Sequence, residues 1–106
     1  MGKGISKIWG KEWTSPAGLE RHFNDHGKKM GYTDSQKYLS GAKNFINGNK
    51  PGTQSFISSD GKTYMYNPST NQFAIVSPSG RIITYYLPDK RMVYWLRELD
   101  KHGIDY

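Results

Sequence analysis

The chain has 106 residues, no cysteine and a formal net charge of +6, from 15 Lys and Arg against 9 Asp and Glu. This length suffices for one domain with a modest core, and the lack of cysteine excludes a disulfide framework and a thiolate zinc site. No apolar run approaches the roughly 20 residues of a membrane span. The positive charge predicts an anionic partner: a nucleic acid, a phosphorylated ligand or an acidic protein.

The first half of the chain carries helical patterns. Residues 1–14 are a lead segment, expected to form a strand or a short turn packed by tryptophan. Ser15 is a typical N-cap ahead of Pro16, and Gly31 stands where a helix often ends. The apolar stripe of this first helix is Leu19, Phe23, His26 and Met30. Thr33 to Gln36 then form a capping box for a second helix that stops at Asn47 and Gly48, so the helical part spans 15–48.

After residue 52 the spacing of apolar residues changes from that of helices to that of strands. Segments 54–58, 62–67, 72–77 and 81–87 are short, rich in β-branched and aromatic residues, and separated by Gly, Pro and Asn turns. They predict an antiparallel meander of four strands, or slightly more, over 53–88, and apolar spacing predicts a closing helix over 90–102. The expected fold is a single α+β domain with the N-terminal helices packed on one face of the sheet.

His22 and His26 lie one helical turn apart, so the two imidazoles can share a substrate or a metal. A metal site would need further ligands, yet there is no cysteine and His102 lies near the far end of the chain, so no metal is expected. Alternatively, His26 is a hydrogen-bonded histidine of the core, because it falls on the apolar stripe. Histidine is also the side chain best suited to proton transfer near neutral pH.

The residue types needed to cleave RNA without a metal are all present. The reaction needs a base, an acid, and donors or cations around the phosphate. His26 and His22 are candidates for proton transfer, and Thr84 and Tyr86 share one side of the last predicted strand, where they offer hydroxyl groups. The candidates for binding phosphate or stacking on bases are Lys28, Lys29, Lys62, Arg81 and Tyr85. Alternatively, these tyrosines are ordinary sheet aromatics and the lysines a solvated helix end.

These segments resemble the toxin domains of bacterial polymorphic and contact-dependent inhibition systems in the barnase, EndoU, colicin D and RelE group of ribonucleases. The resemblance covers roughly residues 19–88. In the helices it rests on His22-Phe23, His26-Gly27, Met30-Gly31, Tyr38-Leu39, Ala42 and Phe45. In the sheet it rests on Tyr64, Tyr66-Asn67-Pro68, Thr70, Phe73, Ser79-Gly80, Thr84-Tyr85-Tyr86 and Pro88.

The resemblance is closest to colicin D, whose catalytic histidine, strand hydroxyl and following aromatic fall on His26, Thr84 and Tyr86. It implies a cofactor-free endoribonuclease, with tRNA the expected target. It further implies an acidic immunity protein bound 1:1, delivery within a larger secreted or cell-surface effector, and action in the target-cell cytoplasm. Asp25 stands where the family has a lysine, and Ile83 and Leu87 where many relatives have basic residues. The phosphate-binding cations are therefore expected elsewhere.

Two other functions are compatible with this sequence. The first is a non-catalytic basic module that binds nucleic acid or a partner and keeps the same fold. The second is a toxin of another chemistry, such as a DNase, which would normally require a metal cluster.

Overall fold

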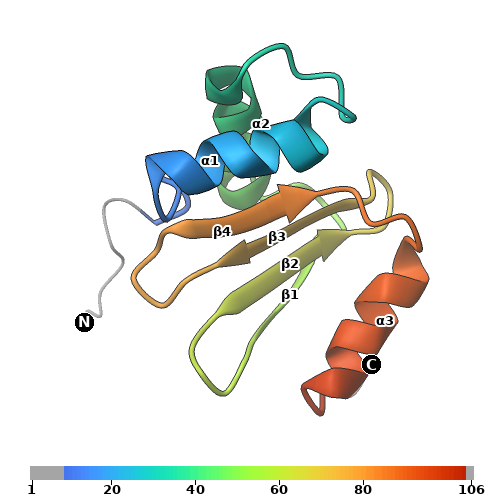
Figure 1. Ribbon diagram of the computed structural model, residues 1–106. Helices are drawn as coiled ribbons and strands as arrows, with labels where there is room; N and C mark the ends of the chain where they lie inside the picture. Colours follow the sequence, from blue (N-terminus) through green and yellow to red (C-terminus); the bar gives the residue numbers. More distant parts are fainter. Residues whose placement is uncertain (1–8, 105–106) are drawn as a thin grey trace.

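The computed structural model describes residues 9–104 and has a four-stranded antiparallel sheet at its centre, with helices on both sides (Figure 1). The elements in chain order are α1 (Pro16–His22), the π-helical turn η1 (Phe23–Gly27), α2 (Ser35–Asn47), β1 (Gln54–Ile57), β2 (Thr63–Asn67), β3 (Gln72–Val76), β4 (Ile82–Tyr86) and α3 (Met92–Lys101). The α+β class is confirmed. No helix in this described part of the chain is long and apolar enough to cross a membrane.

The sheet is a meander in the order β1-β2-β3-β4, and each strand pairs antiparallel with the next. All four predicted strands are confirmed, with ends that differ by a residue or so. The turns use the residues that the sequence indicated: Gly61 and Gly80 adopt positive φ angles of 87° and 94°, which glycine reaches without strain. Asn67 closes the β2–β3 turn, since its side-chain oxygen accepts hydrogen bonds from the N–H groups of Ser69 and Thr70.

A bulge in β4 decides which way its side chains point. Ile75 pairs with Thr84, but the next residue of β3, Val76, pairs with Ile82, so Ile83 is an extra residue in β4. As a result Ile82 and Tyr85 belong to the same buried cluster, although regular alternation would put residues three positions apart on opposite faces. Tyr86 faces the opposite side.

Two apolar clusters cover the two faces of the sheet. On one face α1 and α2 pack against β3 and β4 through residues that include Leu19, Tyr38 and Tyr85. On the other face α3 packs through Trp95 and Leu99 against Phe56, Tyr66 and Phe73. The N-terminal helices therefore share a face as expected, and the closing helix covers part of the opposite one (Figure 1).

The lead segment joins the free edge of β4. Trp13 forms an isolated parallel bridge with Ile82, whose N–H donates to Glu12 and whose carbonyl accepts from Thr14. The Trp13 side chain is buried in the cluster beneath α1. Residues 9–14 therefore form a turn and a bridge packed by Trp13, while residues 1–8 of the expected lead segment lie outside the described part.

The first helix begins where predicted but changes its winding. The Ser15 side chain accepts a hydrogen bond from the N–H of Gly18, as an N-cap should. The α-helix stops at His22, and in η1 the N–H of Lys28 donates to the carbonyl of Phe23, five residues earlier. This wider turn places Gly27 in the buried position that a regular helix would give to His26.

The predicted capping box of α2 is wrong by one residue. The N-cap is Asp34, whose carboxylate accepts from the N–H of Lys37, and not Thr33. Aspartate is at least as good an N-cap as threonine, and the later start leaves Gln36 too early to complete a box. The predicted end at Asn47 and Gly48 is confirmed.

Gly27→Ala tests the packing of η1. A methyl group at Gly27 would lie 2.7 Å from Cδ1 of Phe23 and 2.9 Å from Cδ1 of Tyr38, both ring atoms of the buried cluster. We expect a loss of roughly 1–3 kcal/mol in the free energy of unfolding, measured by urea denaturation. Asn24→Ala, at an exposed position of the same turn, is the control and should change stability by less than about 0.5 kcal/mol. Equal stability of the two variants would contradict this packing.

Candidate active site

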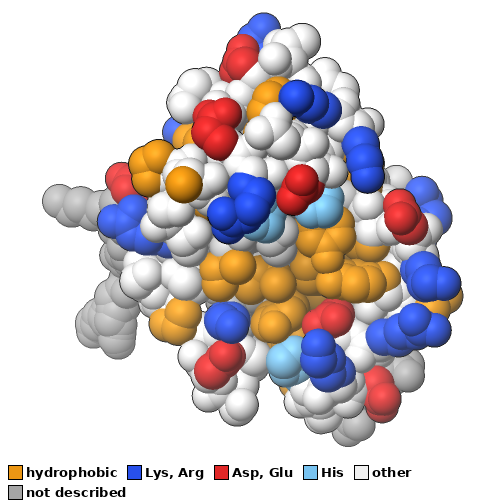
Figure 2. Space-filling view, in the orientation of Figure 1, with side chains coloured by type: hydrophobic (Ala, Val, Ile, Leu, Met, Phe, Trp, Pro, Cys, Tyr) orange, Lys and Arg blue, Asp and Glu red, His pale blue; other side chains and the backbone are white. Residues whose placement is uncertain are grey.

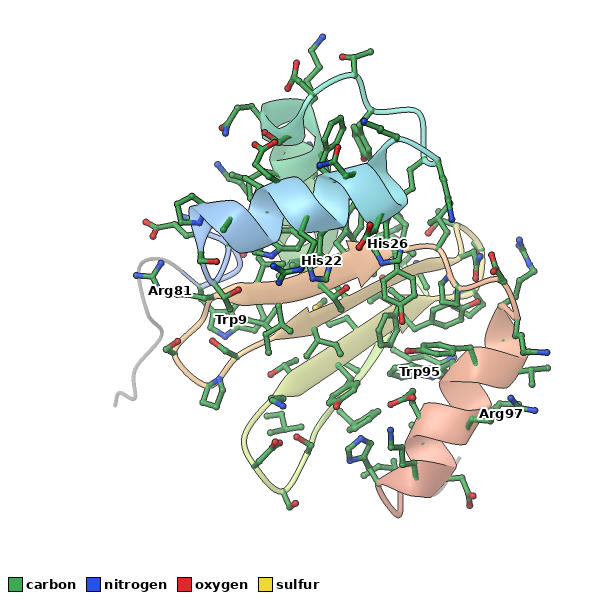
Figure 3. The ribbon with its side chains drawn as sticks, in the orientation of Figure 1. Trp9, His22, His26, Arg81, Trp95 and Arg97 are labelled. Atoms are coloured by element: carbon green, nitrogen blue, oxygen red, sulfur yellow. The ribbon has the colours of Figure 1, made fainter. Side chains whose placement is uncertain are left out.

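His22 and His26 lie side by side above β4, where α1 passes into η1 (Figure 3). The Nδ1 atom of His22 is 3.3 Å from Oγ1 of Thr84. The His26 ring stacks on Tyr86, with ring centroids 4.7 Å apart and planes inclined by 20°. The centroids of the two imidazoles are 5.8 Å apart. The structure therefore brings together all four residues that the sequence suggested for catalysis.

Two local irregularities produce this arrangement. The π-helical turn gives the core position to Gly27, so that His26 faces Tyr86 and not the cluster beneath the helix. The β4 bulge at Ile83 lets Ile82 and Tyr85 share the face covered by the helices, and regular alternation along the strand then puts Thr84 and Tyr86 on the other face. π-helical turns and bulges occur often at functional sites, because each redirects a side chain without ending its element.

A cavity of about 310 Å³ opens beside His26. Its lining residues are His26, Lys29, Met30, Tyr86, Leu87 and Asp89. Figure 2 shows an apolar surface at this part of the molecule, bordered by histidine and by both kinds of charged side chain. The cavity itself is lined by both apolar and polar side chains, and such a concavity is a candidate ligand site.

Burial and neighbouring groups shift the pKa values of His22 and Tyr86. Partial burial lowers the pKa of His22 below its ordinary 6.5, and the nearby His26 lowers it further because two positive imidazoles repel each other. Burial raises the pKa of the Tyr86 hydroxyl far above its ordinary value, and its hydrogen bond to Tyr94 adds to that effect. At neutral pH His22 is thus mainly neutral, and Tyr86 keeps its proton.

His26 is not a core histidine. It is half-buried, it stands outside the cluster of its own helix face, and its ring lines the cavity. Among residues 9–104, no three His, Asp or Glu side chains gather in a way that could hold a metal ion. The third histidine, His102, packs against Tyr64 just after the end of α3.

Tyr85 does not join the site. Its side chain is 1% exposed and lies on the sheet face covered by α2, and its hydroxyl accepts a hydrogen bond from Gln72. The suggested role in base stacking therefore does not fit this tyrosine. The physical reason is the alternation of side chains along β4, which sends Tyr85 and Tyr86 to opposite faces.

Of the suggested cations, Lys29 lines the cavity. Lys28 is exposed, with its Nζ atom 5.7 Å from the centroid of the Phe23 ring. Arg81 pairs with Glu12 at 2.8 Å near the start of β4, and Lys62 pairs with Asp60 in the β1–β2 turn. Neither Arg81 nor Lys62 is among the residues that line the cavity.

Three residues near the site were missed at the level of sequence. Trp13 packs beside His22 with ring centroids 5.3 Å apart, Asp89 lines the cavity, and the Tyr94 hydroxyl bonds that of Tyr86 at 2.5 Å. Trp13 is far from β4 in the sequence, and Tyr94 lies on a separate element eight residues after Tyr86, so no helix or strand spacing rule links either residue to the site. Asp89 lies two residues after the last predicted strand, a position that could have been considered.

No protein-family model matches this chain, and no curated protein sequence matches it. Among solved structures, the chain is similar to a ribonuclease from Escherichia coli complexed with its inhibitor protein. The two share 16% sequence identity and a TM-score of 0.50, and the match covers 82% of this chain and 99% of the other. At this level of identity the similarity shows a shared fold.

Proposed function

We propose that this protein is an endoribonuclease. The observation that carries the proposal is the pair of imidazoles 5.8 Å apart, one beside the Thr84 hydroxyl and the other on a cavity that Lys29 also lines. Fold similarity to a bacterial ribonuclease supports the same function. A pair of histidines can supply the base and the acid of RNA cleavage by proton transfer, and a cation can bind the phosphate.

The proposed reaction is attack by the ribose 2′-oxygen on the adjacent phosphorus. A base removes the 2′-hydroxyl proton, the bond from phosphorus to the 2′-oxygen forms, and the bond to the 5′-oxygen breaks. An acid gives a proton to the departing 5′-oxygen, so the products are a 2′,3′-cyclic phosphate and a free 5′-hydroxyl. Lys29 is placed to offset the extra negative charge of the transition state.

His22 fits the role of base in this scheme. Its lowered pKa keeps it neutral at neutral pH. In the tautomer that carries its proton on Nδ1, His22 donates to Thr84 Oγ1, and the Nε2 atom retains its lone pair and can accept a proton. His26 then acts as the acid, with its ring held against Tyr86. Thr84 is 7% exposed, so its role is to orient His22 and not to reach the phosphate.

The biological setting is part of the same proposal. We take the protein to be a metal-independent toxin domain, delivered within a larger effector, that acts on RNA in the cytoplasm of a target cell, with tRNA as the expected substrate. An acidic immunity protein would bind it 1:1 and protect the producing cell. The net charge of +6 favours rapid association with both RNA and such a partner.

Replacing the histidines tests the activity directly. His26→Ala and His22→Ala should each lower the rate of RNA cleavage in EDTA by a factor of about 10² or more, since each removes one proton-transfer group. His102→Ala, a histidine outside the site, is the matched control and should cleave normally. Folding is checked by circular dichroism. RNA binding without cleavage by the unmodified protein would favour the non-catalytic module, and cleavage only after metal addition would favour a nuclease of another chemistry.

The lowered pKa of His22 predicts how stability depends on pH. As the pH falls through the ordinary value of 6.5, this histidine binds a proton more readily in the unfolded chain than in the folded protein. The folded state should therefore lose stability from about pH 7 downwards, until the pH passes the folded pKa. NMR titration should give His22 a midpoint below 6.5, and His26→Gln should raise it by removing the repulsion. A midpoint at or above 6.5 would contradict this environment.

Charge reversal separates the lysine of the cavity from the other basic residues. Lys29→Glu should reduce cleavage by about tenfold or more and slow association with an acidic inhibitor, because the cavity loses its positive charge. Lys62→Glu is the control, since Lys62 pairs with Asp60 in the β1–β2 turn. The association rate of the inhibitor should also fall with salt. Equal effects of the two reversals would show that net charge, and not the cavity, attracts these ligands.

A further inference from the structure

Tyr86 is held from two sides by elements far apart in the chain. On one side its ring stacks on His26 of η1. On the other side its hydroxyl meets the hydroxyl of Tyr94 at 2.5 Å, and Tyr94 belongs to α3. The two tyrosine rings are nearly perpendicular, with centroids 6.1 Å apart and an interplanar angle of 65°.

Tyr94 is itself firmly placed. Its ring packs edge-on against the fully buried Phe73, with centroids 5.1 Å apart at 88°. The next residue, Trp95, is also fully buried, and its Nε1–H donates to the side-chain oxygen of Gln54 on β1 at 2.8 Å. Helix α3 is thereby anchored to the sheet at the point where it presents the Tyr94 hydroxyl to Tyr86.

We propose that Tyr94 is a positioning residue, through which α3 holds the Tyr86 ring in the orientation on which His26 stacks. The residues that line the cavity include Tyr86 and His26, and Tyr94 is not among them. Its effect on the site therefore passes through Tyr86. The positioning itself follows from the geometry alone, while its consequence for RNA cleavage rests on the proposed function.

The hydrogen bond between the two tyrosines suits this role. Burial raises the pKa of both hydroxyls, so both remain protonated at neutral pH and the contact stays a neutral hydrogen bond. An aromatic side chain has two rotatable bonds, and stacking on one face leaves the ring free to slide in its plane. A bond to the far end of the ring removes that freedom.

Tyr94→Phe tests the proposal because it deletes the hydroxyl and keeps the ring that packs on Phe73. Tyr32→Phe is the matched control: Tyr32 contacts the hydroxyl of Tyr85, at 3.5 Å, on the opposite face of the sheet. In NMR spectra, the ring protons of His26 carry a shift from the stacked Tyr86 ring. We expect Tyr94→Phe to move these signals toward the values of an unstacked histidine, and Tyr32→Phe to leave them in place.

In the RNA assay, Tyr94→Phe should lower kcat by about threefold to tenfold with little change in KM, because the hydrogen bond positions the acid and not the substrate. Unchanged His26 signals in a folded Tyr94→Phe protein would overturn the proposal. If that variant fails to fold, Tyr86→Phe breaks the same bond from the other side and should give the same change in His26. Displaced His26 signals, with no cleavage by the unmodified protein, would support the positioning role and reject the ribonuclease.

Discussion

The structure depends on the way β4 sends some of its side chains into the core and others toward the candidate site. Its bulge at Ile83 lets Ile82 and Tyr85 both enter the cluster under α1 and α2, while Thr84 and Tyr86 face the other side. The buried pair ties the helices to the sheet, and the carbonyl of Tyr85 also accepts a hydrogen bond from the Tyr38 hydroxyl. One short strand therefore supports the core and presents the candidate site.

The N-terminal helix is also irregular where it meets the site. A regular α-helix would place His26 on the stripe of Leu19, Phe23 and Met30, where an imidazole would be buried with apolar neighbours. The π-helical turn puts Gly27 there instead, and the absence of a side chain lets Phe23 and Tyr38 approach closely. His26 is released toward Tyr86. The π-helical turn directs His26 toward β4, and the bulge in β4 lets the strand keep its core contacts while Thr84 and Tyr86 face the two histidines.

The site lies between two apolar clusters, which explains its electrostatics. His22 is close enough to Trp13 and the sheet to lose part of its hydration, and His26 is close enough to repel its positive charge. This environment disfavours protonation of His22, which costs stability in acid and keeps a neutral imidazole available near pH 7. On the far side, α3 closes the second cluster and reaches the site through Tyr94 and Tyr86.

Local sequence rules were enough for the α+β class, the four strands, both ends of α2 to within a residue, and the shared face of Thr84 and Tyr86. These features depend on neighbours in the chain: turn residues, capping side chains and the alternation of a strand. The pairing of His22 with Thr84 and of His26 with Tyr86 depended on the π-helical turn and the bulge, which have no short sequence signal. Which cations line the cavity, and the link from α3 to Tyr86 through Tyr94, depend on how separate elements pack against one another, so only the tertiary structure could decide them.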